Sequence, residues 1–228
     1  MSDFAMAEIN SVSPLDQPIY IHGSSYRHYS GQLNAGTTGS VTYPIGARFG
    51  SLKSLICLPR RSTEISDQAS FSLSSRINPN FVQYNWRIAG LTIPQKPVIL
   101  NNTNLNGGYS EAFIEVMKSF HALDNLSMGT SVTKNAYFTA ETGIDKESIQ
   151  TPGTGFSSYS NGFALATELE SICQRNDTIL AGCNTNGQLV YFEANIGTTG
   201  PAVNYILNFF SYFDQILEIR DGSMYLKF

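Results

Sequence analysis

Apolar and polar side chains alternate with a period of two along much of the chain. The clearest case is residues 81–91, where Val82, Tyr84, Trp86 and Ile88 fall on one face and mostly polar residues on the other. Successive side chains of a strand point to opposite sides of a sheet, so the apolar face should point into a core. The segment is therefore predicted to be a strand with Trp86 buried.

Similar strand-like runs recur between turn signals over most of the chain. They are predicted at residues 19–21, 51–58, 69–77, 135–140, 162–172, 178–180, 188–194, 202–213, 215–220 and 223–228. Pro94 and Pro97 are expected to break the ladder after the strand at 81–91. Asp221-Gly222 predicts a two-residue hairpin. The pattern leaves open whether Asp214 marks a bulge or a turn between two of the runs.

One segment, residues 110–124, has a different period. Its apolar residues are Phe113, Val116, Met117, Phe120 and Leu123. The spacing of three and four residues is that of an amphipathic helix. Ser110 is the predicted N-cap, and Glu111 lies next to the positive end of the helix dipole.

About ten strands and one helix, with no regular alternation between them, predict an all-β protein and exclude Rossmann-type and α/β-barrel folds. The expected fold is a jelly-roll β-sandwich with long loops. Residues 1–37, which are punctuated by proline and glycine, are expected to form an extended N-terminal leader. Residues 38–228 are expected to form a single jelly-roll domain.

Charged residues make up 14% of the chain, below the usual value of about 25%. Ser, Thr, Asn, Gly and Tyr replace them, which suits a surface covered by neighbouring subunits. The formal net charge is −4, and the densest basic group is Arg60-Arg61. Proteins that neutralise nucleic-acid phosphates need a larger basic surface, so direct nucleic-acid binding is not expected.

The three cysteines, Cys57, Cys173 and Cys183, lack the spacing of a disulfide framework or a zinc site. Cys57 lies in an apolar run and is predicted to be a buried free thiol. A reducing compartment is consistent with this pattern. The sequence shows neither a signal peptide nor a membrane-spanning stretch.

Candidate chemistry is sparse, and no catalytic, cofactor-binding or metal-binding residue is predicted. His22, His28 and His121 are too irregularly placed for a metal pair, and His121 falls on the polar side of the predicted helix. Glu168 and Glu170 would share one strand face and could flank a glycosidic bond. A solvent-facing strand edge is the simpler interpretation of that pair.

Several segments of residues 45–125, and more weakly of 185–228, resemble one family. They are Phe49–Arg60, Arg76–Pro79, Tyr84–Gly90 and Ile93–Val98, followed by the predicted helix. In this order they are similar to the C-terminal jelly roll of double jelly-roll major capsid proteins of the polinton, adintovirus and virophage kind. Because a double jelly roll needs about twice this length, the chain would be half of such a protein or a single jelly-roll relative, such as a penton-like vertex or minor capsid protein.

The resemblance implies a structural viral capsid protein, located in the virion and assembled inside the host cell. It implies self-association into trimers or pentamers, contacts with other capsid proteins and no catalytic residues. Two alternatives remain at this point. One is a carbohydrate- or receptor-binding β-sandwich such as a fibre head or lectin. The other is a β-sandwich glycosidase that uses a carboxylate pair.

Overall fold

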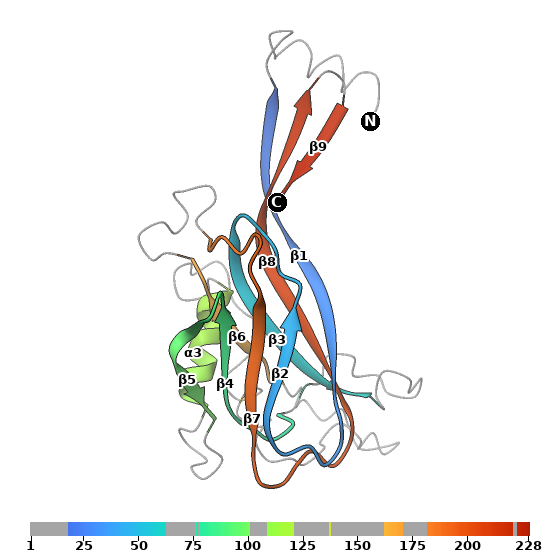
Figure 1. Ribbon diagram of the computed structural model, residues 1–228, viewed down its shortest axis with the longest axis vertical. Coiled ribbons are helices and arrows are strands. Elements are labelled where there is room, and N and C mark those ends of the chain that lie inside the picture. Colours follow the sequence, from blue (N-terminus) through green and yellow to red (C-terminus); the bar gives the residue numbers. More distant parts are fainter. Residues whose placement is uncertain are drawn as a thin grey trace, which may run out of the picture.

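The computed structural model describes residues 18–62, 76, 78–100, 109–120, 137, 162–170, 182–220 and 223–228. These residues form nine strands and one helix (Figure 1). The elements are β1 (Ile19–Leu33), β2 (Gly39–Ile45), β3 (Leu52–Arg61), β4 (Phe81–Ile88), β5 (Leu91–Ile99), α3 (Ser110–Ser119), β6 (Leu165–Glu168), β7 (Val190–Ile196), β8 (Tyr205–Arg220) and β9 (Ser223–Lys227).

The strands make two antiparallel sheets. Sheet A has the order β1-β8-β3-β6, with β9 also paired to β8, and sheet B has the order β2-β7-β4-β5. Four of the hydrogen-bonded pairs are β1 with β8, β2 with β7, β3 with β6 and β4 with β5. This nested pairing of early with late strands is the winding of a jelly roll. The predicted all-β jelly-roll sandwich is confirmed.

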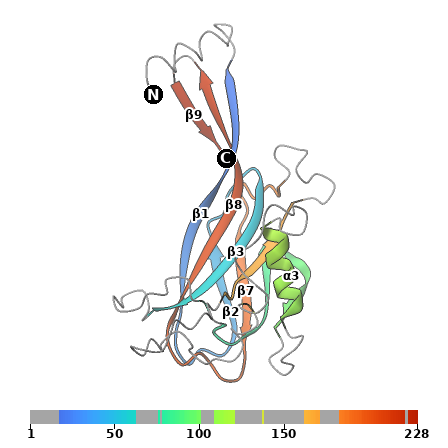
Figure 2. The same ribbon diagram turned by 180° about the vertical axis from the view of Figure 1, so that it is seen from behind.

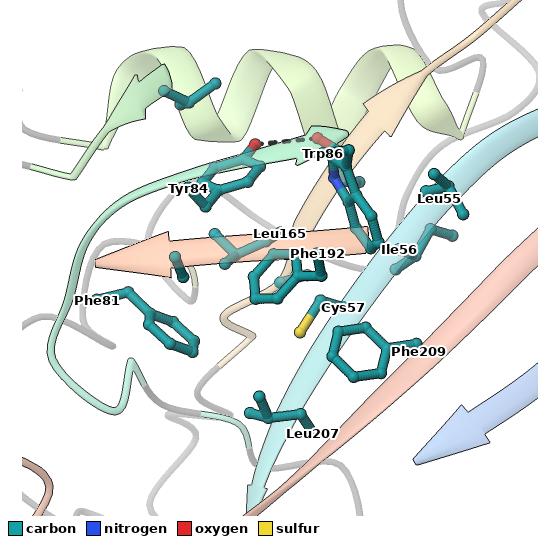
Figure 3. Close-up of a cluster of buried hydrophobic side chains, with 14 of the residues drawn as sticks. Leu55, Ile56, Cys57, Phe81, Tyr84, Trp86, Leu165, Phe192, Leu207 and Phe209 are labelled. Atoms are coloured by element: carbon teal, nitrogen blue, oxygen red, sulfur yellow. Dashed lines mark hydrogen bonds between the residues drawn. The ribbon is translucent and has the colours of Figure 1, made fainter. Parts of the chain in front are cut away.

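The core lies between the two sheets and is rich in aromatic rings (Figure 3). Trp86 of β4 is fully buried, with its ring centroid 4.9 Å from that of Phe192. Phe192 lies 5.3 Å from Phe209, so one continuous set of rings joins the sheets. The predicted burial of Cys57 as a free thiol is confirmed, and burial raises the pKa of that thiol well above its usual value.

The predicted apolar face of β4 is confirmed for Tyr84, Trp86 and Ile88. Val82 is half-buried instead, and Phe81 is fully buried. The β4–β7 register shifts between Phe81 and Gln83, which reverses the alternation at that end. A β-bulge of this kind cannot be read from a period-two pattern.

The prediction that Pro94 and Pro97 break the ladder is confirmed, although both prolines lie inside β5, which continues to Ile99. The pairing with β4 passes from Trp86↔Ile93 to Tyr84↔Val98, so the intervening residues have no partners across the ladder. β5 is the edge strand of sheet B. Proline is tolerated on edge strands and at bulges because no ladder hydrogen bond is required of it there.

Helix α3 is confirmed, but it differs from the prediction at both ends: it ends at Ser119, with Phe120 as its C-cap, short of the predicted end at residue 124. The N-cap is Tyr109, which makes no side-chain capping hydrogen bond, so the prediction of Ser110 as the N-cap is wrong by one residue. The helix buries Ala112, Val116 and Ser119, and Figure 2 shows it beside β6. The predicted strands at 69–77, 135–140 and 178–180 lie outside the described residues, apart from two isolated positions. Arg76 forms a β-bridge with Gly162, whereas Tyr137 is helical, so the predicted strand is wrong at that residue.

Sheet A bears on two sequence predictions: the N-terminal leader and the role of Asp214. Residues 19–33, which the predicted leader included, form β1 and pair with β8 along their whole length. The separation of a leader from the domain stays a prediction for residues 1–17, which lie outside the described residues. The two predicted runs on either side of Asp214 form one strand, β8, so Asp214 marks no turn.

Candidate interaction surface

Three strands of sheet A extend beyond the rest of the described sandwich. They are the start of β1, the end of β8 and all of β9, and both views show them rising past the other strands (Figures 1 and 2). The β3–β8 ladder ends at Leu52↔Phe213, whereas β9 pairs with β8 from Ile216 to Arg220. We call residues 19–22, 216–220 and 223–227 the overhang.

The overhang forms because β9 takes over the edge of β8 that β3 has left. β8 ends at Arg220 and β9 begins at Ser223, and these two residues are register partners. The antiparallel pairing predicted from Asp221-Gly222 is therefore confirmed, while residues 221 and 222 themselves lie outside the described residues. On the other edge, β1 pairs with β8 without interruption from Ile19↔Ile219 to Leu33↔Tyr205.

The strand register gives the overhang one face that is entirely apolar. Two rows of cross-strand neighbours form it: Ile19, Ile219 and Met224 in one row, and Ile21, Leu217 and Leu226 in the other. Met224 and Leu226 are 51% and 54% exposed, and Ile21 is 48% exposed, whereas Ile219 between them is only 6% exposed. Exposed apolar side chains gathered on one face, as on the β1 and β9 sides of this one, mark an interaction site in soluble proteins.

This apolar face continues the core-facing side of the sandwich. Along β8 the buried positions are every second residue, Leu207, Phe209 and Phe213 among them, and the same parity leads to Leu217 and Ile219. Phe228 joins the two parts, with its ring 6.2 Å from that of Phe213. The overhang is therefore one layer of a sandwich whose second described layer, sheet B, stops short of it.

The opposite face of the overhang is mostly polar or aromatic. Its residues are Tyr20, His22, Ile216, Glu218, Arg220, Ser223, Tyr225 and Lys227. Lys227 makes an ion pair with Glu218 and lies over the ring of Tyr20, 5.9 Å from its centroid. The charges of Lys227 and Glu218 are thus paired within the overhang, and the two faces differ sharply in polarity.

An ion-pair network holds the base of the overhang. Lys53 Nζ of β3 lies 2.9 Å from Glu170 Oε1 and 3.1 Å from Asp214 Oδ1 of β8. Ser51 Oγ donates a 2.7 Å hydrogen bond to Asp214 Oδ2. Burial lowers the pKa of Lys53, but its hydrogen bonds to the two carboxylates outweigh burial and raise that pKa overall.

The ion-pair network around Lys53 also includes one member of the acidic pair Glu168 and Glu170 that the sequence analysis considered. β6 ends at Glu168, so Glu168 and Glu170 are not on one strand. The side chain of Glu170 is only 3% exposed and pairs with Lys53, so the interpretation as a solvent-facing edge is wrong for this residue. A carboxylate engaged by an ammonium group favours a structural role over a role in glycoside hydrolysis.

The candidate metal ligands are not brought together. His22 lies on the overhang, and His28 Nε2 lies 3.0 Å from Asn208 Oδ1, while His121 and Cys173 lie outside the described residues. Within the described ranges no group of three His, Cys, Asp or Glu side chains could hold a metal ion.

None of the described helices is both long and apolar enough to cross a membrane.

The overhang is not among the features predicted from the sequence. Its signal was present as three apolar pairs two residues apart: Ile19 and Ile21, Leu217 and Ile219, and Met224 and Leu226. Assigning the first pair to a leader concealed their shared face, because only the register of β1 on β8 aligns them.

The strand order and the two facing sheets define the jelly-roll class, and solved structures similar to this chain include double jelly-roll major capsid proteins of viruses. The PBCV-1 virus capsid structure has a TM-score of 0.52 and 9% identity, and the match covers 93% of this chain and 52% of that one. The chain thus spans about half the length of that capsid protein. No protein-family model and no curated protein sequence matches it.

Two further solved structures have TM-scores below 0.5. The Sputnik virophage structure has a TM-score of 0.46 and 13% identity over 94% of this chain and 39% of that one. The mavirus major capsid protein has a TM-score of 0.44 and 9% identity over 96% of this chain and 43% of that one. At these identities the likeness concerns the fold alone, and the PBCV-1 match, with a TM-score above 0.5, supports it.

Proposed function

We propose that the protein is a non-enzymatic structural subunit of an icosahedral viral capsid, located in the virion. The observation that carries this proposal is the overhang, a single sheet layer whose core-facing side remains apolar beyond sheet B. The similarity in fold to viral capsid proteins supports the same function. We further propose that the subunits associate into trimers or pentamers and contact other capsid proteins.

An apolar sheet face needs a second layer to cover it. Burial of apolar surface stabilises an interface by about 25 cal/mol per Å² before the costs of association are subtracted. The partner that matches such a face is another apolar β-surface, supplied by a second copy of this chain or by another capsid protein. The low charge of the chain, 14% of residues, suits a surface that neighbours cover.

The binding-module alternative is not supported. The single Trp of the chain, Trp86, is fully buried in the core and cannot stack on a sugar ring, which leaves exposed rings such as those of Tyr20 and Tyr225. We propose that assembly takes place in the reducing interior of a host cell, where a free thiol such as that of Cys57 is stable. It includes no direct contact with nucleic acid.

The test is the solution mass of the full chain, measured by light scattering over a concentration series. We expect the wild-type protein to form trimers, pentamers or larger closed particles. Leu226→Lys places a charge on the apolar face and should weaken association at least about tenfold, because a buried unpaired charge is costly. A wild-type monomer at every concentration would contradict the proposal.

The neighbouring residue offers a matched control. Tyr225 is 53% exposed, against 54% for Leu226, but it points to the opposite face of β9. Tyr225→Lys adds the same charge at the same exposure and should leave the mass unchanged. If both variants weakened association equally, the apolar face would not be the interface.

A further inference from the structure

The outer side of sheet A, opposite the core, carries a pocket of about 430 Å³. Three neighbouring strands, β1, β3 and β8, and the isolated bridge residue Arg76 line it. The lining residues are His28, Leu58, Arg60, Arg76, Asn208 and Phe210. The pocket is separate from the overhang, and its capacity to bind a ligand does not depend on the proposed capsid function.

Two guanidinium groups meet in this pocket without a counter-charge. Within the described part of the chain, neither Arg60 nor Arg76 has a carboxylate in ion-pair contact, although five other ion pairs are found there. The Nε atoms of both are buried and have no hydrogen-bond partner. Burial, and then the positive charge of Arg60, lower the pKa of Arg76. Such an arrangement is unfavourable unless an anion compensates it.

The polar groups beside the arginines are held in place. His28 Nε2 donates to Asn208 Oδ1 at 3.0 Å, because the amide oxygen can only accept. Asn208 Nδ2 in turn donates to the backbone oxygen of Leu58 at 3.4 Å. The imidazole also packs against Phe210, with ring centroids 5.0 Å apart. A site that is ordered before binding loses less entropy when a ligand arrives.

We propose that this pocket binds a phosphate-type dianion, either inorganic phosphate or a phosphate monoester. A single dianion would neutralise the charges of both arginines that line the pocket. The planar guanidinium fork matches phosphate oxygens in two-pronged hydrogen bonds. A monocarboxylate would compensate only one of the two charges. The pocket is thus a local anion site, unlike the extended basic surface that a nucleic-acid backbone requires.

The test is a calorimetric titration of the full chain with inorganic phosphate at constant ionic strength. We expect saturable binding of one phosphate per chain. Arg60→Gln and Arg76→Gln should each weaken it about tenfold or more, since each removes charge-assisted hydrogen bonds. Phenyl phosphate in a second titration distinguishes a monoester ligand, which should bind at least as tightly, from free phosphate.

Arg61→Gln is the matched control. It removes the same charge from the adjacent residue, whose Nε lies 3.5 Å from Tyr205 Oη and which does not line the pocket. Phosphate affinity should stay within about twofold of wild type. The circular dichroism melting temperature of each variant separates loss of binding from loss of fold. Absence of saturable binding, equal loss in Arg61→Gln, or acetate binding as tight as phosphate would each overturn the proposal.

Discussion

The sandwich and the overhang are built from the same two strands, β1 and β8, yet they meet different surroundings. In the sandwich, the inner side of β8 packs against sheet B, and Phe209 is 1% exposed. In the overhang, the same side of the same strand continues with Leu217 and Ile219 between half-exposed neighbours. The alternation of side chains does not change between the two regions. Among the described residues, only the sandwich has a second sheet packed on this side of β8.

Core-like patterning and core formation are therefore separate properties. The alternation of apolar and polar residues indicates which side of a strand will be buried. The topology determines whether the sheet that buries it belongs to the same chain. β9 replaces β3 beside β8 and extends sheet A, but β2, β7, β4 and β5 do not accompany it. An interface between subunits can thus use the pattern of a core.

Truncating one side chain in each region should have very unequal costs. Phe209→Ala removes a ring that contacts Trp86 and Phe192, and it should lower the free energy of unfolding by about 4 kcal/mol. Leu217→Ala, on the same face of the same strand, should cost the isolated subunit only about 1 kcal/mol, because its surroundings are partly solvent. Urea unfolding at low protein concentration measures both. Equal losses would show that the overhang is already covered within the subunit.

A smaller effect is expected at the boundary between the two regions. Lys53→Met leaves Glu170 and Asp214 without their shared cation and should lower the free energy of unfolding by about 3 kcal/mol. Lys118→Met is the control, since it removes the same group from a more exposed pair with Glu115 on α3 and should cost about 0.5 kcal/mol. Similar losses in urea unfolding would indicate that the Lys53 network does not tie β3 to β8.

The smallest expected effect is a loss of folding stability at alkaline pH that depends on Tyr84 in the sandwich core. Burial raises the pKa of Tyr84 above its ordinary value of 10.0, and its hydroxyl donates to Ala166 O at 3.0 Å. The folded state keeps this proton where the unfolded state loses it, so stability falls as pH rises above 10. This group contributes a slope of about 1.4 kcal/mol per pH unit. Tyr84→Phe should show a shallower alkaline slope in urea unfolding, whatever its stability at neutral pH. An unchanged slope would contradict the assignment.

Much of the fold was predictable because local patterns and the structure agree. The alternation in β4, the helical spacing around Val116 and the pairing of β8 with β9 each reflect interactions between residues close in sequence. The predicted burial of Trp86 and Cys57 rests on the same kind of signal. These features depend on period and turn chemistry, which a single sequence contains.

The remaining features depend on contacts between distant segments. The bulge at Phe81 and the continuation of β5 through its prolines are set by registers with neighbouring strands. The overhang and the pocket each combine β1 with β8, whose paired residues lie far apart in the sequence at the tip, as for Ile19 and Ile219. Arg76 lines the pocket together with Asn208 and Phe210 of β8, and no local pattern in the sequence indicates that these residues lie close together. Such juxtapositions follow from the topology and not from periodicity.

The unbroken ladder between β1 and β8 also has a mechanical consequence. A load applied to the tip passes into the sandwich through two covalently continuous strands, and no loop or hinge interrupts either of them over the paired range from Ile19↔Ile219 to Leu33↔Tyr205. Sliding one strand along the other would strain many hydrogen bonds at once. The overhang is thus a stiff lever, so a displacement of a neighbouring subunit at its tip would turn the whole sandwich.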